Sequence, residues 1–212
     1  MTTLIKLDLK KKNGVLFDDK NSVIKKFYLK KNFLSSKKIN NEFNGHQWYS
    51  NQLNKKQNNN KRFNIKKKSN SIILPVFKGQ TFNYWDKVIY KKNLVERVIN
   101  HYKLIWPQEK YAPYHGDLTI ENIIFLKKSG IMIIDWENFK IKELWGLDIC
   151  YFLISLVVLP VLSFKKEIIN QPELNLFEFY WKKTFKKNYF YLENPIEFIK
   201  TKHKNTNHFF YK

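Results

Sequence analysis

Hydrophobic and polar residues alternate through the first thirty residues of the chain, as they do in strands that bury one face. Residues 3–10 and 22–29 show this alternation clearly, and a shorter segment at 15–17 lies between them. Asn13-Gly14 is a dipeptide typical of two-residue hairpin turns. The pattern therefore predicts a small antiparallel meander at the N-terminus.

A helix and a buried strand are predicted to complete the front of the chain. Residues 38–53 place their apolar side chains on one side of a helix, although Gly45 lowers the helix propensity. Residues 57–70 are polar and low in complexity, which predicts an exposed loop with a short strand near 63–65. Residues 71–77 then predict a buried strand that ends near Pro75.

The pattern becomes mainly helical after residue 77. Residues 83–106 have the length and spacing of a helix that ends before Pro107. Two later segments, 147–164 and 174–190, are apolar and long enough to be helices.

A small β insert interrupts these helices. Residues 112–125 predict strand, loop and strand, and residues 131–134 predict another short strand that delivers Asp135 at its end. The sum is an α+β protein with a strand-rich part at 1–77 and a mainly helical part at 78–212.

Composition alters this picture little. The chain has 212 residues, 43% of them hydrophobic, which is enough for one sizeable core or two small lobes. Its 39 Lys and Arg against 18 Asp and Glu give a net charge of +21, a balance that attracts polyanions. Lysine and asparagine nevertheless occur in nearly every segment, and the sequence carries no nucleic-acid-binding motif. We therefore expect no specific nucleic-acid partner.

Cysteine and leader patterns favour a cytoplasmic protein. The single cysteine, Cys150, excludes an intramolecular disulfide and suits a reducing compartment. The N-terminus lacks the continuous apolar stretch of a signal peptide. The longest apolar run, 149–164, is shorter than the ~18 residues of a membrane-spanning helix and contains Pro160. It predicts a buried helix and no transmembrane segment, with peripheral membrane contact as the alternative.

Three oxygen-bearing side chains lie in two motifs near the middle of the chain. The segment YHGDLTIENIIF carries Asp117 and Asn122, and the segment IIDWEN carries Asp135. Mg²⁺ prefers oxygen ligands and is commonly held by one or two side chains together with substrate phosphates, so Asn122 and Asp135 suffice as its protein ligands. Asp117 precedes Asn122 by five positions, the spacing of the aspartate and the metal-binding asparagine in protein-kinase catalytic loops.

Together these motifs resemble the aminoglycoside phosphotransferase and choline kinase family of the protein-kinase-like superfamily. The resemblance is carried by HGDLTIEN, IIDWE and the following GLD, in the order and at the short separation typical of that family. It implies a bilobed protein-kinase-like fold, with a small antiparallel-sheet N-lobe that binds nucleotide (1–77) and a mainly helical C-lobe for catalysis and substrate (78–212). The implied activity is transfer of the γ-phosphoryl group of ATP, assisted by Mg²⁺, to a hydroxyl of a small molecule.

The same resemblance implies roles for the residues of the two motifs. Asp117 is the catalytic base or orients the acceptor hydroxyl, and Asn122 and Asp135 hold magnesium. His115 braces the loop and does not react.

Two acidic residues nearby keep two interpretations each. Asp148 resembles the family aspartate that steadies the catalytic loop, but an aspartate before an apolar run is also an ordinary helix cap. Glu137 either reaches the outer shell of the metal or is solvated.

The front of the chain should supply a cation for the phosphates and a carboxylate that holds this cation. Lys25 and Lys26 are the candidates, and strand alternation does not decide between them. The likeness of residues 23–25 to the kinase V-A-I-K pattern favours Lys25. Glu42 is the only acidic residue between positions 20 and 85, which makes it the expected partner.

The connector after residue 75 resembles the family segment whose backbone meets adenine, so Val76, Phe77 and Lys78 are candidate nucleotide contacts. The predicted first hairpin contains one glycine, Gly14, where protein kinases have a glycine-rich phosphate cover. This departure leaves a catalytically inactive nucleotide-binding or scaffolding protein as the alternative function. It also leaves the choice between ATP and GTP open.

The acceptor is predicted only as a class. Lysines throughout 140–204 favour a neutral or anionic acceptor over a cationic one, although a general lysine bias would place the same residues there. The predicted classes of acceptor are sugars, amino alcohols and cell-envelope glycan precursors.

Overall fold

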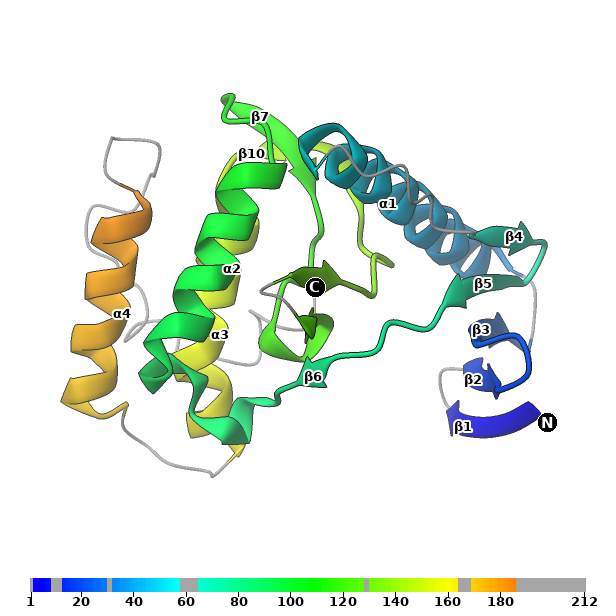
Figure 1. Cartoon of the computed structure of the whole chain (residues 1–212), viewed down its shortest axis with the longest axis horizontal. Coiled ribbons are helices and arrows are strands. Elements are labelled where there is room, and N and C mark those ends of the chain that lie inside the picture. Colours follow the sequence, from blue (N-terminus) through cyan, green and yellow to red (C-terminus); the bar gives the residue numbers. More distant parts are fainter. Residues whose placement is uncertain are drawn as a thin grey trace.

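The computed structural model describes residues 2–8, 13–29, 32–57, 65–127, 130–163 and 169–185. Over these residues the protein is an α+β structure with an antiparallel five-stranded sheet, two smaller sheets and four α-helices (Figure 1). The α+β class predicted from the sequence is thereby confirmed.

The first sheet contains the front of the chain. Its strands are β1 (Thr2–Asp8), β2 (Asn13–Asp18), β3 (Val23–Tyr28), β4 (Lys66–Lys68) and β5 (Ser71–Pro75). They lie in the order β1-β2-β3-β5-β4, and every neighbouring pair is antiparallel. The predicted meander and the strand that ends at Pro75 are therefore confirmed.

Two details of this region differ from the prediction. Asn13 and Gly14 do not form the turn, because they lie in β2 and pair with Asp8 and Leu7 of β1. The connection between the two strands falls in residues 9–12, outside the described part of the chain. Residues 58–64 are also outside it, and Ile65 precedes β4, so the strand expected near 63–65 is found only from Lys66 onward.

Helix α1 (Phe33–Gln57) is longer than predicted and contains Gly45 in its interior. It begins with reciprocal hydrogen bonds: the Ser35 backbone N–H donates to Asn32 Oδ1 at 2.8 Å, and the Asn32 N–H donates to Ser35 Oγ at 2.9 Å. A Cβ at position 45 would lie 2.6 Å from the Cβ of Trp136, so glycine is needed for close packing. This contact accounts for a residue that otherwise weakens a helix by about 1 kcal/mol.

The rest of the chain forms helices around two small sheets. Its elements are β6 (Gln80–Thr81), the short 3₁₀ turns η1 (Tyr84–Asp86), η2 (Val88–Tyr90) and η3 (Ile120–Asn122), α2 (Lys92–Ile105), β7 (Tyr111–Tyr114), β8 (Ile123–Phe125), β9 (Ile131–Ile133), β10 (Lys140–Leu144), α3 (Leu147–Ser163) and α4 (Gln171–Thr184). β7 pairs with β10, and β8 lies between β6 and β9. Figure 1 shows α2, α3 and α4 on the side away from the first sheet.

The helix predicted over 83–106 is wrong in its first half. Lys87 adopts a left-handed backbone with φ of 47°, which ends η1 and separates it from η2. α2 then starts at Lys92 and ends before Pro107, as predicted. Strand β10 was not anticipated, whereas α3 begins at the predicted residue. α4 starts three residues before its predicted beginning, and residues 186–190 of that prediction lie outside the described part.

Aromatic side chains join α1 to the second half of the molecule. The ring of Trp136 is fully buried and lies 5.2 Å from Tyr49, 5.8 Å from Trp48 and 6.0 Å from Trp106, measured between centroids. Two of these partners come from α1 and one follows α2. Helix α1 is therefore packed against the segment that carries Asp135 as well as against β4 and β5.

None of the described helices is both long and apolar enough to cross a bilayer.

Candidate active site

The loop from His115 to Asn122 connects β7 to β8 and is closed by its own side chains. The Asn122 amide Nδ2 donates to the backbone oxygen of Asp117 at 2.8 Å and lies 3.4 Å from Asp117 Oδ2. The Thr119 N–H donates to the same backbone oxygen at 2.9 Å. Because the amide nitrogen of Asn122 is turned to Asp117, its Oδ1 is the atom left to bind a cation.

The side chain of His115 supports this loop through contacts of both ring nitrogens, as expected. Its buried ring lies with Nε2 at 2.9 Å from the backbone oxygen of Ile134, and its Nδ1 accepts the Asp117 N–H at 3.2 Å. This pattern requires a neutral ring with the proton on Nε2. Burial lowers the pKa of His115 to about 4, which keeps the ring neutral near pH 7.

Asp148 holds the start of the loop. Its carboxylate accepts the backbone N–H groups of His115 at 2.8 Å and Gly116 at 3.0 Å, from the first turn of α3. Of the two interpretations for Asp148, the structure therefore supports the one in which it steadies the loop. Gly116 has φ of 87°, and a Cβ there would lie 2.6 Å from Asn138 Cβ, so both conformation and space require glycine.

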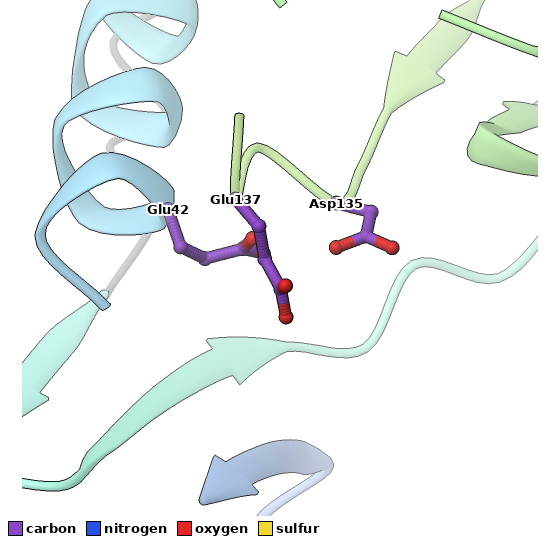
Figure 2. A group of neighbouring side chains, drawn as sticks. All are labelled: Glu42, Asp135 and Glu137. Atoms are coloured by element: carbon purple, nitrogen blue, oxygen red, sulfur yellow. The ribbon is translucent and has the colours of Figure 1, made fainter. Parts of the chain in front are cut away.

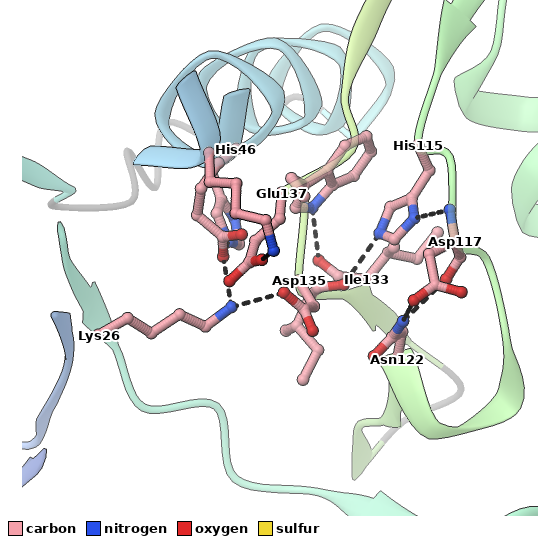
Figure 3. A network of polar contacts seen from close by, with 12 residues as sticks. Lys26, His46, His115, Asp117, Asn122, Ile133, Asp135 and Glu137 are labelled. Atoms are coloured by element: carbon pink, nitrogen blue, oxygen red, sulfur yellow. Dashed lines mark hydrogen bonds and ion pairs between the residues drawn. The ribbon is translucent and has the colours of Figure 1, made fainter. Parts of the chain in front are cut away.

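Asp135 follows β9 and faces the loop. The pairing of β8 with β9 and the hydrogen bond from the Ile134 N–H to the Asn122 backbone oxygen, at 3.0 Å, bring the two motifs to the same edge. Asp135 has a left-handed φ of 67°, a strained conformation for a residue with a side chain and one that often occurs at functional sites. Figure 3 shows Asp135 between Lys26 on one side and the Asp117 and Asn122 pair on the other.

The ion pair predicted for Lys25 and Glu42 is formed by Lys26. Its Nζ lies 2.9 Å from Glu42 Oε1 and 2.8 Å from Asp135 Oδ1. In the antiparallel ladder Lys26 lies opposite Ile72, which is 1% exposed, whereas Lys25 lies opposite the partly exposed Ile73. Since paired residues share a face of the sheet, Lys26 points to the interior and Lys25 does not.

Glu42 is buried beside a histidine that the sequence did not single out. His46 Nε2 lies 3.2 Å from Glu42 Oε1, one helical turn along α1. Burial alone would raise the pKa of Glu42, but Lys26 and His46 lower it to about 2. Burial also opposes the charge on Lys26, yet Glu42 and Asp135 raise the pKa of Lys26 above its ordinary value. Both groups of the pair are therefore charged at neutral pH.

Glu42, Asp135 and Glu137 form an acidic cluster whose ligand atoms lie within 4.8 Å of one another (Figure 2). Lys26 contacts the first two of these carboxylates, and Lys38 Nζ lies 2.8 Å from Glu137 Oε2. Of the two interpretations for Glu137, the solvated one is thus contradicted, since both of its carboxylate oxygens contact protein side chains.

Two oxygens of the two motifs remain as candidate ligands for a magnesium ion. Within the described part of the chain, Asp135 Oδ1 is bonded to Lys26 while its other oxygen accepts no hydrogen bond. That oxygen and Asn122 Oδ1 offer the carboxylate and carbonyl ligands that Mg²⁺ prefers.

Asp117 is partly buried and contacts Tyr151, a residue that the sequence analysis did not single out. Burial and the nearby charge of Asp135 raise the pKa of Asp117 to about 6, and hydrogen bonds from Asn122 and Tyr151 oppose the shift. Tyr151 lies on α3, three residues after Asp148. Because residues at this spacing share a helix face, the assignment of Asp148 to the loop would have pointed to Tyr151 as well.

Of the three candidate nucleotide contacts in the connector, two contact other parts of the protein and one is exposed. The Val76 N–H donates to the Ser22 backbone oxygen at 3.0 Å. Phe77 packs against the hydrophobic core, and Lys78 is exposed.

No protein-family model matches the chain, and no curated protein matches it at a significant level of sequence similarity. The interpretation of the site therefore depends on its own residues and geometry.

Proposed function

We propose that this protein is a small-molecule kinase with a bilobed, protein-kinase-like arrangement that transfers the γ-phosphoryl group of ATP to an alcohol group. The observation that supports this most strongly is the position of Asp135 between two sets of polar contacts. One set joins Glu42 to Lys26 and Lys26 to Asp135, and the other, on the opposite side of Asp135, joins Asn122 to Asp117 (Figure 3). Phosphoryl transfer needs a cation for the phosphates, oxygen ligands for magnesium and an acidic group for the acceptor.

On the nucleotide side, the ammonium of Lys26 would bind phosphate oxygens while Glu42 and His46 keep it in place. Asn122 and Asp135 would hold magnesium, which when bound neutralises charge on the phosphates. The Lys26 to Asp135 contact of 2.8 Å keeps this charged group close to the metal ligands before nucleotide binds.

On the acceptor side, Asp117 would orient the attacking hydroxyl. With a pKa of about 6 it is mostly a carboxylate at neutral pH and accepts the hydroxyl proton as the acceptor oxygen bonds to the γ-phosphorus. The bond from the γ-phosphorus to the bridging oxygen breaks, and ADP is the leaving group. Asn122 and Tyr151 fix the carboxylate of Asp117 for this step.

The acceptor is a sugar, an amino alcohol or an envelope-glycan precursor. Strand β7 leads into the loop of Asp117, and its partner β10 carries the exposed Lys140 and Lys142. Positive charge at this edge favours the sugars and glycan precursors over the amino alcohols, which are cationic at neutral pH. A cytoplasmic location is part of this proposal; the proposed dependence on ATP and the single buried thiol, Cys150, support it.

The test is an ATP-consumption screen of the purified protein against sugars, amino alcohols, nucleosides and aminoglycosides. Asp117→Ala and Asp135→Ala should each lower turnover by at least about 10³-fold, because orientation of the acceptor or binding of the metal is lost. Asp19→Ala is the matched control, since Asp19 is an exposed turn residue. Turnover at the wild-type level in either site variant would contradict the proposal.

A nucleotide-binding protein without catalysis is the second candidate, favoured by the single glycine of the first hairpin, Gly14. Thermal unfolding with ATP and Mg²⁺ separates the two, because a ligand that binds only the native state raises its stability. A stabilised protein that turns over no acceptor of the panel would support this candidate instead.

A further inference from the structure

Glu137 contacts both elements that carry the Lys26–Glu42 ion pair. The Tyr28 hydroxyl donates to Glu137 Oε1 at 3.1 Å, and Lys38 Nζ lies 2.8 Å from Oε2. The Asn41 amide Nδ2 donates to the Glu137 backbone oxygen at 3.0 Å. Both carboxylate oxygens and the carbonyl are therefore engaged by β3 and α1.

The two side-chain partners of the Glu137 carboxylate each lie on the same face of their strand or helix as the residue that forms the ion pair. Tyr28 lies two residues after Lys26 on β3, so the two side chains share a face of the strand. Lys38 lies four residues before Glu42 on α1, so these two also share a face. Glu137 thus reaches each element directly beside the residue that contributes to the ion pair.

Neighbouring residues of the same segment add to this attachment. Asp135 pairs with Lys26, and Trp136 packs so closely on α1 that only glycine fits at position 45. The three successive residues 135–137 therefore contact β3 and α1 through a carboxylate, an aromatic ring and a second carboxylate.

We propose that Glu137 is a positioning residue, which fixes β3 and α1 in the relative placement at which Lys26 meets Glu42. Its contacts with Tyr28, Lys38 and Asn41 form the Glu137 latch. A role as metal ligand is less compatible with the geometry, since each carboxylate oxygen already accepts from a side chain. The consequence for catalysis rests on the proposed kinase function, whereas the latch itself does not.

The latch can be tested without nucleotide or metal, by hydrogen exchange of the full chain in EDTA. Glu137→Ala and Lys38→Met should each speed exchange of the α1 amides around residues 38–46 by about tenfold, the effect of losing a charge-assisted hydrogen bond on local opening. Glu143→Ala is the matched control, because it removes an ion pair of similar length, 2.7 Å to Lys140, that does not touch α1. Lys38→Met also serves if Glu137→Ala fails to fold.

The functional consequence is tested by the affinity for ATP with Mg²⁺. Glu137→Ala should weaken binding by about tenfold, and Glu137→Gln, which still accepts from Tyr28, should recover part of the loss. In a Glu42→Gln background the additional effect of Glu137→Ala should disappear, because both act through Lys26. If Glu137→Ala weakened ATP binding only through a general loss of structure, its effect would add in full to that of Glu42→Gln.

Unchanged exchange in α1 for both latch variants would overturn the proposal, as would full additivity with Glu42→Gln. Loss of protection in Glu137→Ala but not in Lys38→Met would also overturn it, since the latch requires both partners. A wild-type protein that fails to bind ATP with Mg²⁺ would contradict the proposed kinase function alone, and the exchange experiment would still decide on the latch.

Discussion

The two sides of the candidate site are held together in different ways. On the loop side, His115, Gly116 and Asp148 are joined by short hydrogen bonds to backbone groups, and both ionisable side chains are buried. On the lysine side, Lys26 links Glu42 with Asp135 through ion pairs that span up to 109 positions of the sequence, and Lys26 is still 22% exposed.

The loop side therefore depends mainly on backbone geometry, and the lysine side depends mainly on paired charges. The loop side has a geometry set by backbone conformation, so its most sensitive positions should be those with special φ and no space for a Cβ. The lysine side has a geometry set by a few charges on long side chains, so its most sensitive positions should be the paired charges, whose removal leaves a buried partner uncompensated.

Apart from the carboxylate variants at Asp117 and Asp135, the largest effect is expected on the lysine side, from Lys26→Met. Loss of the ammonium removes the proposed phosphate contact and leaves Glu42 buried with His46 as its remaining polar partner among the described residues, so the proposed phosphoryl transfer should fall by about 10²- to 10³-fold. Lys25→Met, which changes the same residue type on the opposite face of β3, should stay within about threefold of wild type. Steady-state kinetics with ATP checks both variants, and equal losses would mean that strand facing does not decide the role.

A smaller effect is expected on the loop side, from Gly116→Ala. A side chain at φ of 87° and a Cβ 2.6 Å from Asn138 should cost about 2–3 kcal/mol of unfolding free energy. Gly130→Ala is the control, because φ there is not left-handed and the nearest atom would lie 3.4 Å away. Urea unfolding measures both, and a stable Gly116→Ala protein with normal turnover would remove the argument that the loop is sterically determined.

The smallest effect concerns pH, and it separates the two sides. The folded pKa of His115, about 4, lies below the ~6.5 expected of an unfolded histidine, so the unfolded state takes up a proton first as pH falls. The contribution of His115 to stability should therefore decrease between pH 6.5 and 4, so that wild type loses about 1 kcal/mol from pH 7 to 5.5 relative to His115→Gln.

Between pH 7 and 5.5 Glu42 should contribute almost no slope. Its ordinary pKa of 4.5 and its folded pKa of about 2 both lie below pH 5.5, and its stabilisation is lost as pH falls through 4.5 towards 2. Urea unfolding across pH, on wild type and His115→Gln, gives the measurement. Parallel curves for the two proteins would show that His115 is not buried in its neutral form.

Element type was largely predictable because it depends on local pattern. The alternation of residues 22–29 and the apolar run from residue 147 led to β3 and α3. The boundaries that were missed depend on contacts from elsewhere: Gly45 remains in a helix because Trp136 packs on it. Strand β10 exists through its pairing with β7, which its own polar sequence does not indicate.

The sequence by itself determined which polar side chains the two motifs carry, since the spacing of Asp117, Asn122 and Asp135 is a covalent property of the chain. Tertiary structure alone decided that Lys26 is the lysine that faces Glu42, because the sheet face that is buried depends on what packs against it. It also decided that Glu137 is held by β3 and α1, since three segments distant in sequence must meet before these charges can pair.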